Sequence, residues 1–314
     1  MMTYQEARAY FEEIAGRGSV LGLENMNRLM EAMGHPERTL RVVHIAGTNG
    51  KGSVCSMLSS ILREAGFKVG LFTSPYIVEY NERIQINNKN IPNDELAEIV
   101  TYIRPFADAM EDRPTEFELN TAIGMVYFAR HSCDIVVLEV GMGGEFDSTN
   151  IIDPPLVAVL AHIGLDHTKE LGHTVEEIAA TKSKIIKEGC RAVIYAQGDN
   201  ILEVIRKRCE EVGAEMSVSE PEKLERMSID LDRQIFYHPD FGSLAVALIG
   251  DYQRENLAVV LKVVQVLKTM GIKIPGIAVS NGLETVRWPG RFEVIGRRPT
   301  FIVDGAHNPQ GMDA

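Results

Sequence analysis

The sequence predicts an α/β protein built on a doubly wound, mainly parallel sheet, and three observations support this fold class. Short runs of β-branched and aliphatic residues alternate along the chain with longer segments of helical apolar spacing. Several runs are apolar throughout, which is typical of strands buried on both faces of a sheet. The run at residues 41–46 leads through a glycine-rich turn into a helical segment. Ligands are therefore expected at the carboxyl ends of the strands.

Strands and helices are expected to alternate along most of the chain. Buried parallel strands are predicted at residues 41–46, 68–73, 134–140, 156–162 and 191–196. Helical spacing predicts helices at residues 3–15, 24–33, 93–110, 115–130, 175–187, 201–212, 251–270 and 275–283. Alternating apolar residues predict an antiparallel edge at residues 234–237 and 243–248.

Two helix starts and one loop carry more specific expectations. Asn93 is expected to cap its helix, and Thr115 to cap the next one, with Glu118 at the capping-box position. Residues 76–92 are polar and show no clear periodicity, so they are expected to form a long loop. Long loops inside compact domains are usually functional.

Composition narrows the class of protein. With 314 residues, 45% of them hydrophobic, the chain can build one large α/β domain or two smaller ones. The net charge of −12 and the lack of a basic stretch argue against a nucleic acid partner. No run approaches the roughly 18 apolar residues of a membrane span. The cysteines form no Cys-x-x-Cys pair, which indicates a reduced, cytoplasmic protein; they are Cys55, Cys133, Cys190 and Cys209.

The turn at residues 47–53 is predicted to cradle phosphates. Its residues are Gly47, Thr48, Asn49, Gly50, Lys51, Gly52 and Ser53. A glycine-rich turn before a helix presents backbone N–H groups where the helix dipole favours anions, and Lys51 adds a point charge. The spacing differs from the usual P-loop because Gly52 displaces the hydroxyl that normally follows the lysine. The alternative is an ordinary glycine-rich turn between a strand and a helix.

Polar side chains at other strand ends are candidate metal ligands. Glu139 ends an otherwise aliphatic strand, where a carboxylate needs a cation, and Mg²⁺ beside a phosphate site is the natural candidate. A salt bridge to a surface lysine is the alternative. His167 also follows a strand, where a hydrogen-bonded structural histidine is equally common. Zinc is disfavoured because His162, His167 and His173 match no common spacing.

Two further sites are less obvious from the pattern. Lys182 lies within a predicted helix and on sequence alone is expected to be solvated. Residues 304–309 form a polar loop after the predicted strand at residues 300–303.

A series of motifs resembles the folylpolyglutamate synthases of the Mur ligase superfamily, which are often bifunctional with dihydrofolate synthase. In chain order these are HIAGTNGKGSV, LFTSP, NERIQIN, TEFELNTA, LEVGMGGEFDSTN, IGLDHT, TKSKIIK, WPGRFEV and DGAHNP. They span essentially the whole chain. Departures from the family pattern occur at Glu145, Lys184 and Tyr252, none of which is an expected metal or phosphate ligand.

The resemblance implies an ATP-dependent ligase that adds L-glutamate to the carboxylate of a folate or dihydropteroate through an acyl phosphate. It implies ATP and Mg²⁺ as cofactors, a Mur-ligase-like central ATPase domain and a monomer. Lys51, Lys182 and His307 are then catalytic, with Lys182 carbamylated. The nucleotide is held by Gly47, Thr48, Asn49, Gly50, Lys51, Gly52, Ser53, Gln253, Asn256, Arg291 and Asp304. The metal is held by Ser74, Glu139 and His167, and the loop at residues 76–87 closes near the folate.

The resemblance also sets an expected domain organisation. Residues 1–295 would form the ATP-binding domain, and residues 296–314 a linker and the start of a truncated, Rossmann-like C-terminal domain. The apolar run at residues 300–303 would then be a buried strand without partners, and residues 297–314 would be mobile or dock irregularly. Two alternatives follow: a non-catalytic ATP-binding module with little ligase activity, and a P-loop hydrolase or kinase outside the ligases.

Overall fold

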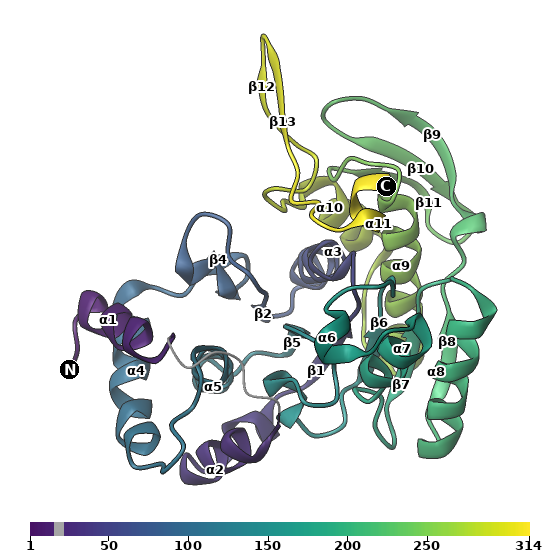
Figure 1. Cartoon of the computed structure of the whole chain (residues 1–314). Coiled ribbons are helices and arrows are strands. Elements are labelled where there is room, and N and C mark those ends of the chain that lie inside the picture. The colour runs from purple at the N-terminus through teal and green to yellow at the C-terminus, as the bar shows by residue number, and fades with distance from the viewer. Residues whose placement is uncertain (16–21) are drawn as a thin grey trace.

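A computed structural model describes residues 1–15 and 22–314, and its centre is an eight-stranded sheet in the order β4-β3-β2-β5-β1-β6-β7-β8 (Figure 1). Strands β2, β5, β1, β6, β7 and β8 are parallel, and β3 and β4 add an antiparallel edge. The strands are β1 (Val42–Ala46), β2 (Val69–Phe72), β3 (Ile84–Ile86), β4 (Lys89–Asn90), β5 (Ile135–Glu139), β6 (Val157–Leu160), β7 (Arg191–Ile194) and β8 (Glu215–Val218). The predicted fold class is confirmed.

Helices cover both faces of this sheet. Val43 and Ile45 of β1 pack in one cluster with α3 (Lys51–Glu64), α9 (Gln253–Thr269) and α10 (Gly276–Thr285). On the opposite face Val42 packs with α1 (Tyr4–Ala15), α2 (Glu24–Ala32), α4 (Asn93–Asp108) and α5 (Glu116–Arg130). Ala46, on that same face, packs with α7 (Val175–Ser183) and α8 (Asp199–Val212). The alternation along β1 follows the two-residue repeat of a strand and makes the sheet doubly wound.

A second, three-stranded antiparallel sheet covers part of the α9 and α10 side. It contains β9 (Glu225–Ile229), β10 (Gln234–His238) and β11 (Gly242–Val246) in the order β11-β10-β9. Its inner residues Phe236, Leu244 and Val246 join the cluster around α3 and α9. The predicted antiparallel strands are therefore confirmed, although they form their own sheet rather than an edge of the central one.

The prediction of a long loop at residues 76–92 is wrong in part. Residues Tyr80–Arg83 form a short 3-10 helix, η2, and β3 and β4 then form a hairpin against β2. Asn87 and Asn88 make the tight turn, with φ angles of 51° and 59°. Asparagine tolerates this left-handed conformation, and two such residues in succession are the backbone pattern of a hairpin turn.

The predicted helix caps have different outcomes. Thr115 is confirmed: its hydroxyl accepts a hydrogen bond from the Glu118 N–H (3.3 Å), and the Glu118 side chain accepts one from the Thr115 N–H (2.7 Å). Asn93 is not the cap, because α4 has Pro92 at that position. The Asn93 side chain instead accepts a hydrogen bond from Asn81 (2.9 Å), which ties the helix start to η2.

The C-terminal segment differs most from expectation. Strand β13 (Thr300–Val303) pairs with β12 (Glu293–Arg297) in an antiparallel hairpin that projects from the body of the molecule (Figure 1). All residues of β13 are exposed, so the prediction of a buried strand without partners is wrong. The chain then returns to the glycine turn through α11 (Pro309–Asp313). The expected domain boundary after residue 295 falls within β12 and stays a prediction.

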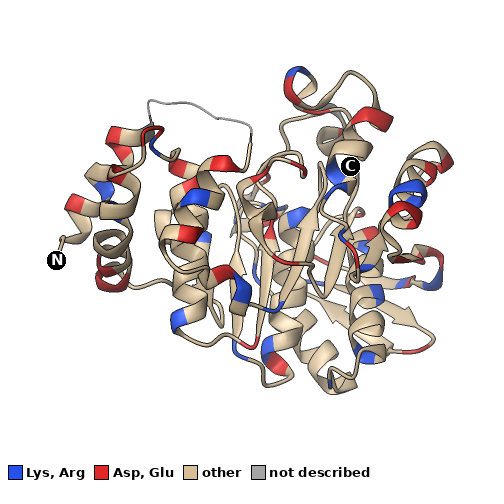
Figure 2. Cartoon of the chain, turned by 90° about the horizontal axis from the view of Figure 1, so that it is seen from below, with Lys and Arg blue, Asp and Glu red and all other residues tan. Residues whose placement is uncertain are grey.

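Charged residues lie mainly on helices and loops and few lie on the central strands (Figure 2). Burial of the apolar strands between helices leaves the polar groups at strand ends as the places where chemistry can occur. No helix in residues 1–15 and 22–314 is long and apolar enough to cross a membrane.

Candidate active site

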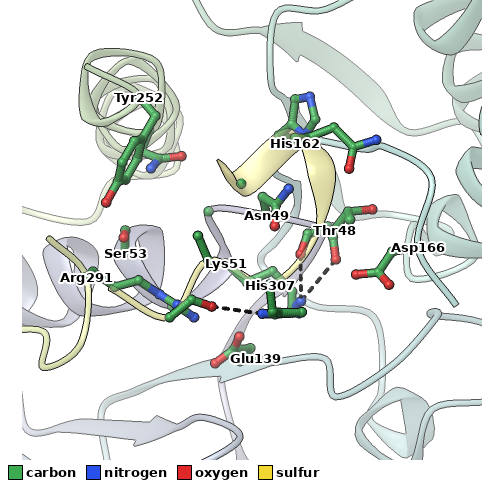
Figure 3. Close-up of a pocket in the computed structure, with 18 of the residues that line it drawn as sticks. Thr48, Asn49, Lys51, Ser53, Glu139, His162, Asp166, Tyr252, Arg291 and His307 are labelled. Carbon is green, nitrogen blue, oxygen red and sulfur yellow. Dashed lines mark hydrogen bonds between the residues drawn. The ribbon is translucent and has the colours of Figure 1, made fainter. Parts of the chain in front are cut away.

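The glycine turn and several strand ends enclose one cavity of about 340 Å³ (Figure 3). Its walls come from the turn between β1 and α3, from the carboxyl ends of β2, β5 and β6, and from the segment after β13. Among the residues expected at the site, those that line the cavity are Gly47, Thr48, Asn49, Gly50, Lys51, Gly52, Ser53, Ser74, Glu139, His167, Lys182, Asn256, Arg291, Asp304 and His307. The sequence therefore predicted one site rather than scattered polar residues.

Gln253 does not line this cavity, which corrects its expected place against a nucleotide. Its side chain is fully buried at the start of α9. It donates a hydrogen bond to the Ser53 hydroxyl (3.3 Å) and accepts one from the Asn256 amide (3.0 Å). Gln253 thus supports two lining residues from behind.

The glycine turn has a fixed shape. Gly50 precedes α3 with a φ of 84°, and a Cβ at this position would lie 2.4 Å from the Asn256 side chain. The N–H groups of Thr48 and Asn49 donate to the carbonyl of His162 (2.7 and 3.2 Å), which anchors the turn to the end of β6. The N–H groups of the first turn of α3 have no intrahelical acceptor, so they are available to an anion.

Lys51 folds back over this turn. Its Nζ donates hydrogen bonds to the carbonyls of Gly47 (3.1 Å) and Thr48 (3.3 Å), as the dashed lines in Figure 3 show. Carbonyl oxygens are weaker partners for an ammonium than anionic oxygens are. A phosphate in the cavity would therefore compete well for Lys51.

Glu139 is a buried carboxylate at the end of β5. Only 3% of it is exposed, and its Oε2 accepts a hydrogen bond from the Ser74 N–H (3.2 Å). Burial raises its pKa to about 7, although Lys51 opposes the rise. In the part of the chain that the structure describes, Glu139 forms no ion pair, so the alternative of a salt bridge to a surface lysine is wrong. A cation in the cavity would supply the missing charge.

The proposed metal ligands fit a hard cation in their chemistry. Ser74, Glu139 and His167 all line the cavity, and carboxylate and hydroxyl oxygens suit Mg²⁺. The His167 side chain is half exposed, with its Nε2 4.0 Å from Asp166. Among the described residues, no three His, Cys, Asp or Glu side chains cluster as a metal site. A metal here would need Ser74 and bound phosphate oxygens to complete its ligands.

Lys182 lies at the wall of the cavity, so the prediction of a solvated lysine is wrong, and the site role that the resemblance implies for it stays a prediction. Only 4% of the residue is exposed, and its Nζ donates to the Gly47 carbonyl (3.0 Å), which Lys51 also contacts. Burial lowers its pKa to about 7, with a further contribution from Lys51 and opposition from Asp147. A substantial fraction of its amine is therefore neutral near pH 7.

The C-terminal segment closes the remaining side of the cavity. Asp304 accepts hydrogen bonds from the Phe292 N–H (2.7 Å) and the Tyr252 hydroxyl (3.3 Å). Asn308 and Asn49 exchange two side-chain hydrogen bonds (3.1 and 3.2 Å). The His307 ring contacts the Gly305 carbonyl (2.8 Å) and lines the cavity. Of the two expectations for residues 297–314, mobility or docking on the main domain, the structure shows docking, because Asn308 contacts the phosphate turn.

Sequence reasoning missed several lining residues. Asp166, His162, Tyr195 and Tyr252 also face the cavity. The first three follow the ends of β6 and β7, so the rule that ligands bind at strand ends could have found them. Tyr252 stood out in the sequence only as a departure from the family pattern; it precedes α9 and reaches the site through the packing of that helix.

Comparisons with known proteins agree with this geometry. Residues 45–264 match the Mur ligase middle domain. The chain is 38% identical to the dihydrofolate synthase/folylpolyglutamate synthase of Bacillus subtilis, over 99% of this chain and 74% of that protein. It is 34% identical to the folylpolyglutamate synthase of Lacticaseibacillus casei, over 99% of this chain and 75% of that protein.

Solved structures of folylpolyglutamate synthases are also similar to this chain. An FPGS–AMPPCP–folate complex superposes with a TM-score of 0.92 at 34% identity, covering 99% of this chain and 78% of that one. The Mycobacterium tuberculosis folylpolyglutamate synthase complexed with ADP gives a TM-score of 0.91 at 29% identity, covering 99% of this chain and 72% of that one. The chain therefore belongs to the folylpolyglutamate synthase family of Mur ligases.

Proposed function

We propose that this chain uses ATP to join L-glutamate to the carboxylate of a folate or dihydropteroate. The observation that carries the proposal is that a phosphate turn, a buried carboxylate and a buried lysine share one cavity. Relatives named as dihydrofolate or folylpolyglutamate synthases match nearly the whole chain, which disfavours a non-catalytic ATP-binding module. The folate and AMPPCP in a similar solved structure support the same substrate classes.

The proposed reaction has two steps. A carboxylate oxygen of the folate attacks the γ-phosphorus of ATP, and ADP leaves, which gives an acyl phosphate. The amine of glutamate then attacks the acyl carbon, loses a proton, and phosphate leaves. Lys51 and the first turn of α3 would hold the phosphates through both steps, since both present positive charge to the cavity.

Ser74, Glu139 and His167 would hold Mg²⁺, which when bound would neutralise charge on the phosphate oxygens. The fit rests on Glu139, a buried carboxylate that forms no ion pair in the described residues. Lys182 would carry a carbamate. Its neutral amine attacks CO₂, a proton leaves to solvent, and an anion replaces the cation beside the turn. A monomer is proposed as the active unit.

Substrate-dependent phosphate release tests the function. Purified protein with ATP, Mg²⁺ and a folate or dihydropteroate should release phosphate only after L-glutamate is added. Mass spectrometry of the product should show one added glutamyl residue. Nucleotide binding without glutamate-dependent release would favour the non-catalytic module instead.

The Lys51→Ala variant should bind nucleotide about 10–100-fold more weakly, because a hydrogen bond to a charged group contributes about 1.5–3 kcal/mol. The Lys51→Arg variant should recover only part of this, since a planar guanidinium does not replace a point charge. Titration calorimetry with a non-hydrolysable ATP analogue measures both. Thermal unfolding of the free variant is the control for its fold. Unchanged affinity in Lys51→Ala would remove the phosphate role of the turn.

A further inference from the structure

A chain of buried polar side chains crosses the core beside the cavity. His44 and Thr149 are fully buried, and Asp147 is 6% exposed. The His44 Nε2 lies 2.8 Å from the Thr149 hydroxyl, and that hydroxyl lies 2.5 Å from Asp147 Oδ1. His44 is in the middle of β1. On the same face of the sheet its neighbours are Val42, which packs with α1, α2, α4 and α5, and Ala46, which packs with α7 and α8. His44 therefore points into the seam between the two helical layers on that face.

The hydrogen bonds that link His44, Thr149 and Asp147 all donate toward Asp147. Asp147 accepts from the Thr149 N–H (3.0 Å), the Thr149 hydroxyl and the Met142 N–H (2.8 Å), as an ionised carboxylate does. The only hydroxyl hydrogen of Thr149 thus goes to Asp147, so its oxygen accepts from the His44 Nε2–H. This fixes the tautomer of His44 and leaves Nδ1 as an acceptor, and Nδ1 has no hydrogen-bond partner in residues 1–15 and 22–314.

Asp147 also stabilises the turn that follows Glu139. Its Oδ2 accepts a hydrogen bond from the N–H of Met142, and Gly141 and Met142 line the cavity. The same turn lies against Lys182: a Cβ on Gly144 would be 2.8 Å from the Lys182 Cα. The N–H of Glu145 also donates to the carbonyl of Thr181 (3.1 Å). A displacement of Asp147 would therefore reach both Glu139 and Lys182 through the backbone.

We propose that His44 is a positioning residue, which acts through Thr149 and Asp147 to hold the turn at residues 141–147 against Lys182. This inference rests on the proposed function. The other residues of β1 are Val42, Val43, Ile45 and Ala46, and all are buried aliphatic side chains. An aliphatic residue at position 44 would avoid a buried nitrogen without a partner and would stabilise the core. A polar residue that costs stability and orders a site is typical of functional positions.

Two variants at Thr149 distinguish a role of its hydroxyl in positioning the turn from a role of its side chain in packing. Thr149→Val keeps the shape and removes the hydroxyl, and Thr149→Ser keeps the hydroxyl and removes a methyl group. We expect kcat for ligation to fall about tenfold or more in Thr149→Val, with KM for ATP within about twofold. Thr149→Ser should stay within about threefold of the parent. The opposite ranking, with Ser worse than Val, would show a packing role and overturn the proposal.

A double-mutant cycle tests the link to His44. His44→Leu should lower kcat and raise the melting temperature, because it removes the unpartnered nitrogen. The His44→Leu/Thr149→Val protein should be no slower than Thr149→Val alone, since both changes break one chain. Independent, multiplying losses would overturn the proposal. If Thr149→Val does not fold, His44→Leu decides alone: an unchanged kcat contradicts the role.

Amide hydrogen exchange provides a readout that does not need activity. The Met142 N–H should exchange faster in His44→Leu and Thr149→Val than in the parent, while amides in α9 keep their protection. Slow exchange at Met142 in both variants would contradict the proposal. If the parent itself makes no glutamylated product, the proposed function fails, and the exchange result still tests the His44–Thr149–Asp147 chain.

Discussion

The Glu139→Gln variant is expected to lose ligation by about 10²–10³-fold while the chain remains folded. Glu139 is the buried carboxylate of the cavity, and among the residues that the structure describes only the Ser74 N–H donates to it. An amide of the same shape keeps the packing but lacks the charge that would hold a divalent cation at the phosphates, and electrostatic groups at a reacting centre contribute on this scale. Glu170→Gln, an exposed carboxylate on α6 (Thr168–Leu171), is the matched control. Near-normal turnover in Glu139→Gln would remove Glu139 from the metal site.

The same variant should gain stability above pH 7. Burial raises the pKa of Glu139 from 4.5 to about 7, so the folded protein holds this proton more tightly than the unfolded chain. Stability is therefore lost as pH rises from about 4.5 to 7, and the full cost remains above pH 7. Glutamine avoids this cost, which amounts to about 3 kcal/mol at most. Urea unfolding at pH 4 and pH 8, without nucleotide or metal, should show the gain only at pH 8.

The parts of this site that local patterns encode could be predicted from the sequence. A β-branched run before a glycine turn determines β1 and α3, and a polar residue ending an aliphatic strand marks Glu139. Parallel strands deliver such residues to one edge of the sheet, so their convergence needs no knowledge of long-range contacts.

The sequence-based predictions fail where tertiary packing determines burial and strand pairing. The sequence alone predicts a solvated Lys182, because helical spacing does not show which neighbours cover a helix, and the turn around Gly144 covers this one. The β3–β4 hairpin was missed because its strands span only Ile84–Ile86 and Lys89–Asn90. The apolar run at Thr300–Val303 predicts a buried strand, yet in the structure it pairs with β12 in an exposed hairpin.

The Lys182→Met variant should lose ligation by about 10²-fold or more and at the same time become more stable. Lys182 is a buried lysine whose Nζ has, among the described residues, one carbonyl as its partner, and methionine fills a similar volume without the charge. Loss of activity together with a gain in stability is the signature of a residue kept for function. Lys184→Met, at the C-cap of the same helix, is the matched control and should change neither property greatly.

The stability gain has a defined pH dependence. Burial lowers the pKa of Lys182 from 10.5 to about 7, so between these values the unfolded chain binds the proton and the folded protein does not. Stability of the parent therefore rises with pH across this window, and the cost of Lys182 is fully present only below about pH 7. Melting temperatures should show the largest gain of Lys182→Met at pH 6 and little gain near pH 10. A gain that is constant with pH would contradict the lowered pKa.

If Lys182 is carbamylated, we expect a dependence on CO₂ that loss of the lysine charge in Lys182→Met does not by itself predict. Because the neutral amine is the form that adds CO₂, the parent supplied with ¹³C-bicarbonate should show a carbamate signal that grows as pH rises through about 7. That signal should be missing in Lys182→Met and unchanged in Lys184→Met. Removal of CO₂ should lower ligation by the parent and bicarbonate should restore it. If Lys182→Met is inactive but the parent shows neither the signal nor the CO₂ dependence, Lys182 acts as a free amine, and the carbamate is excluded.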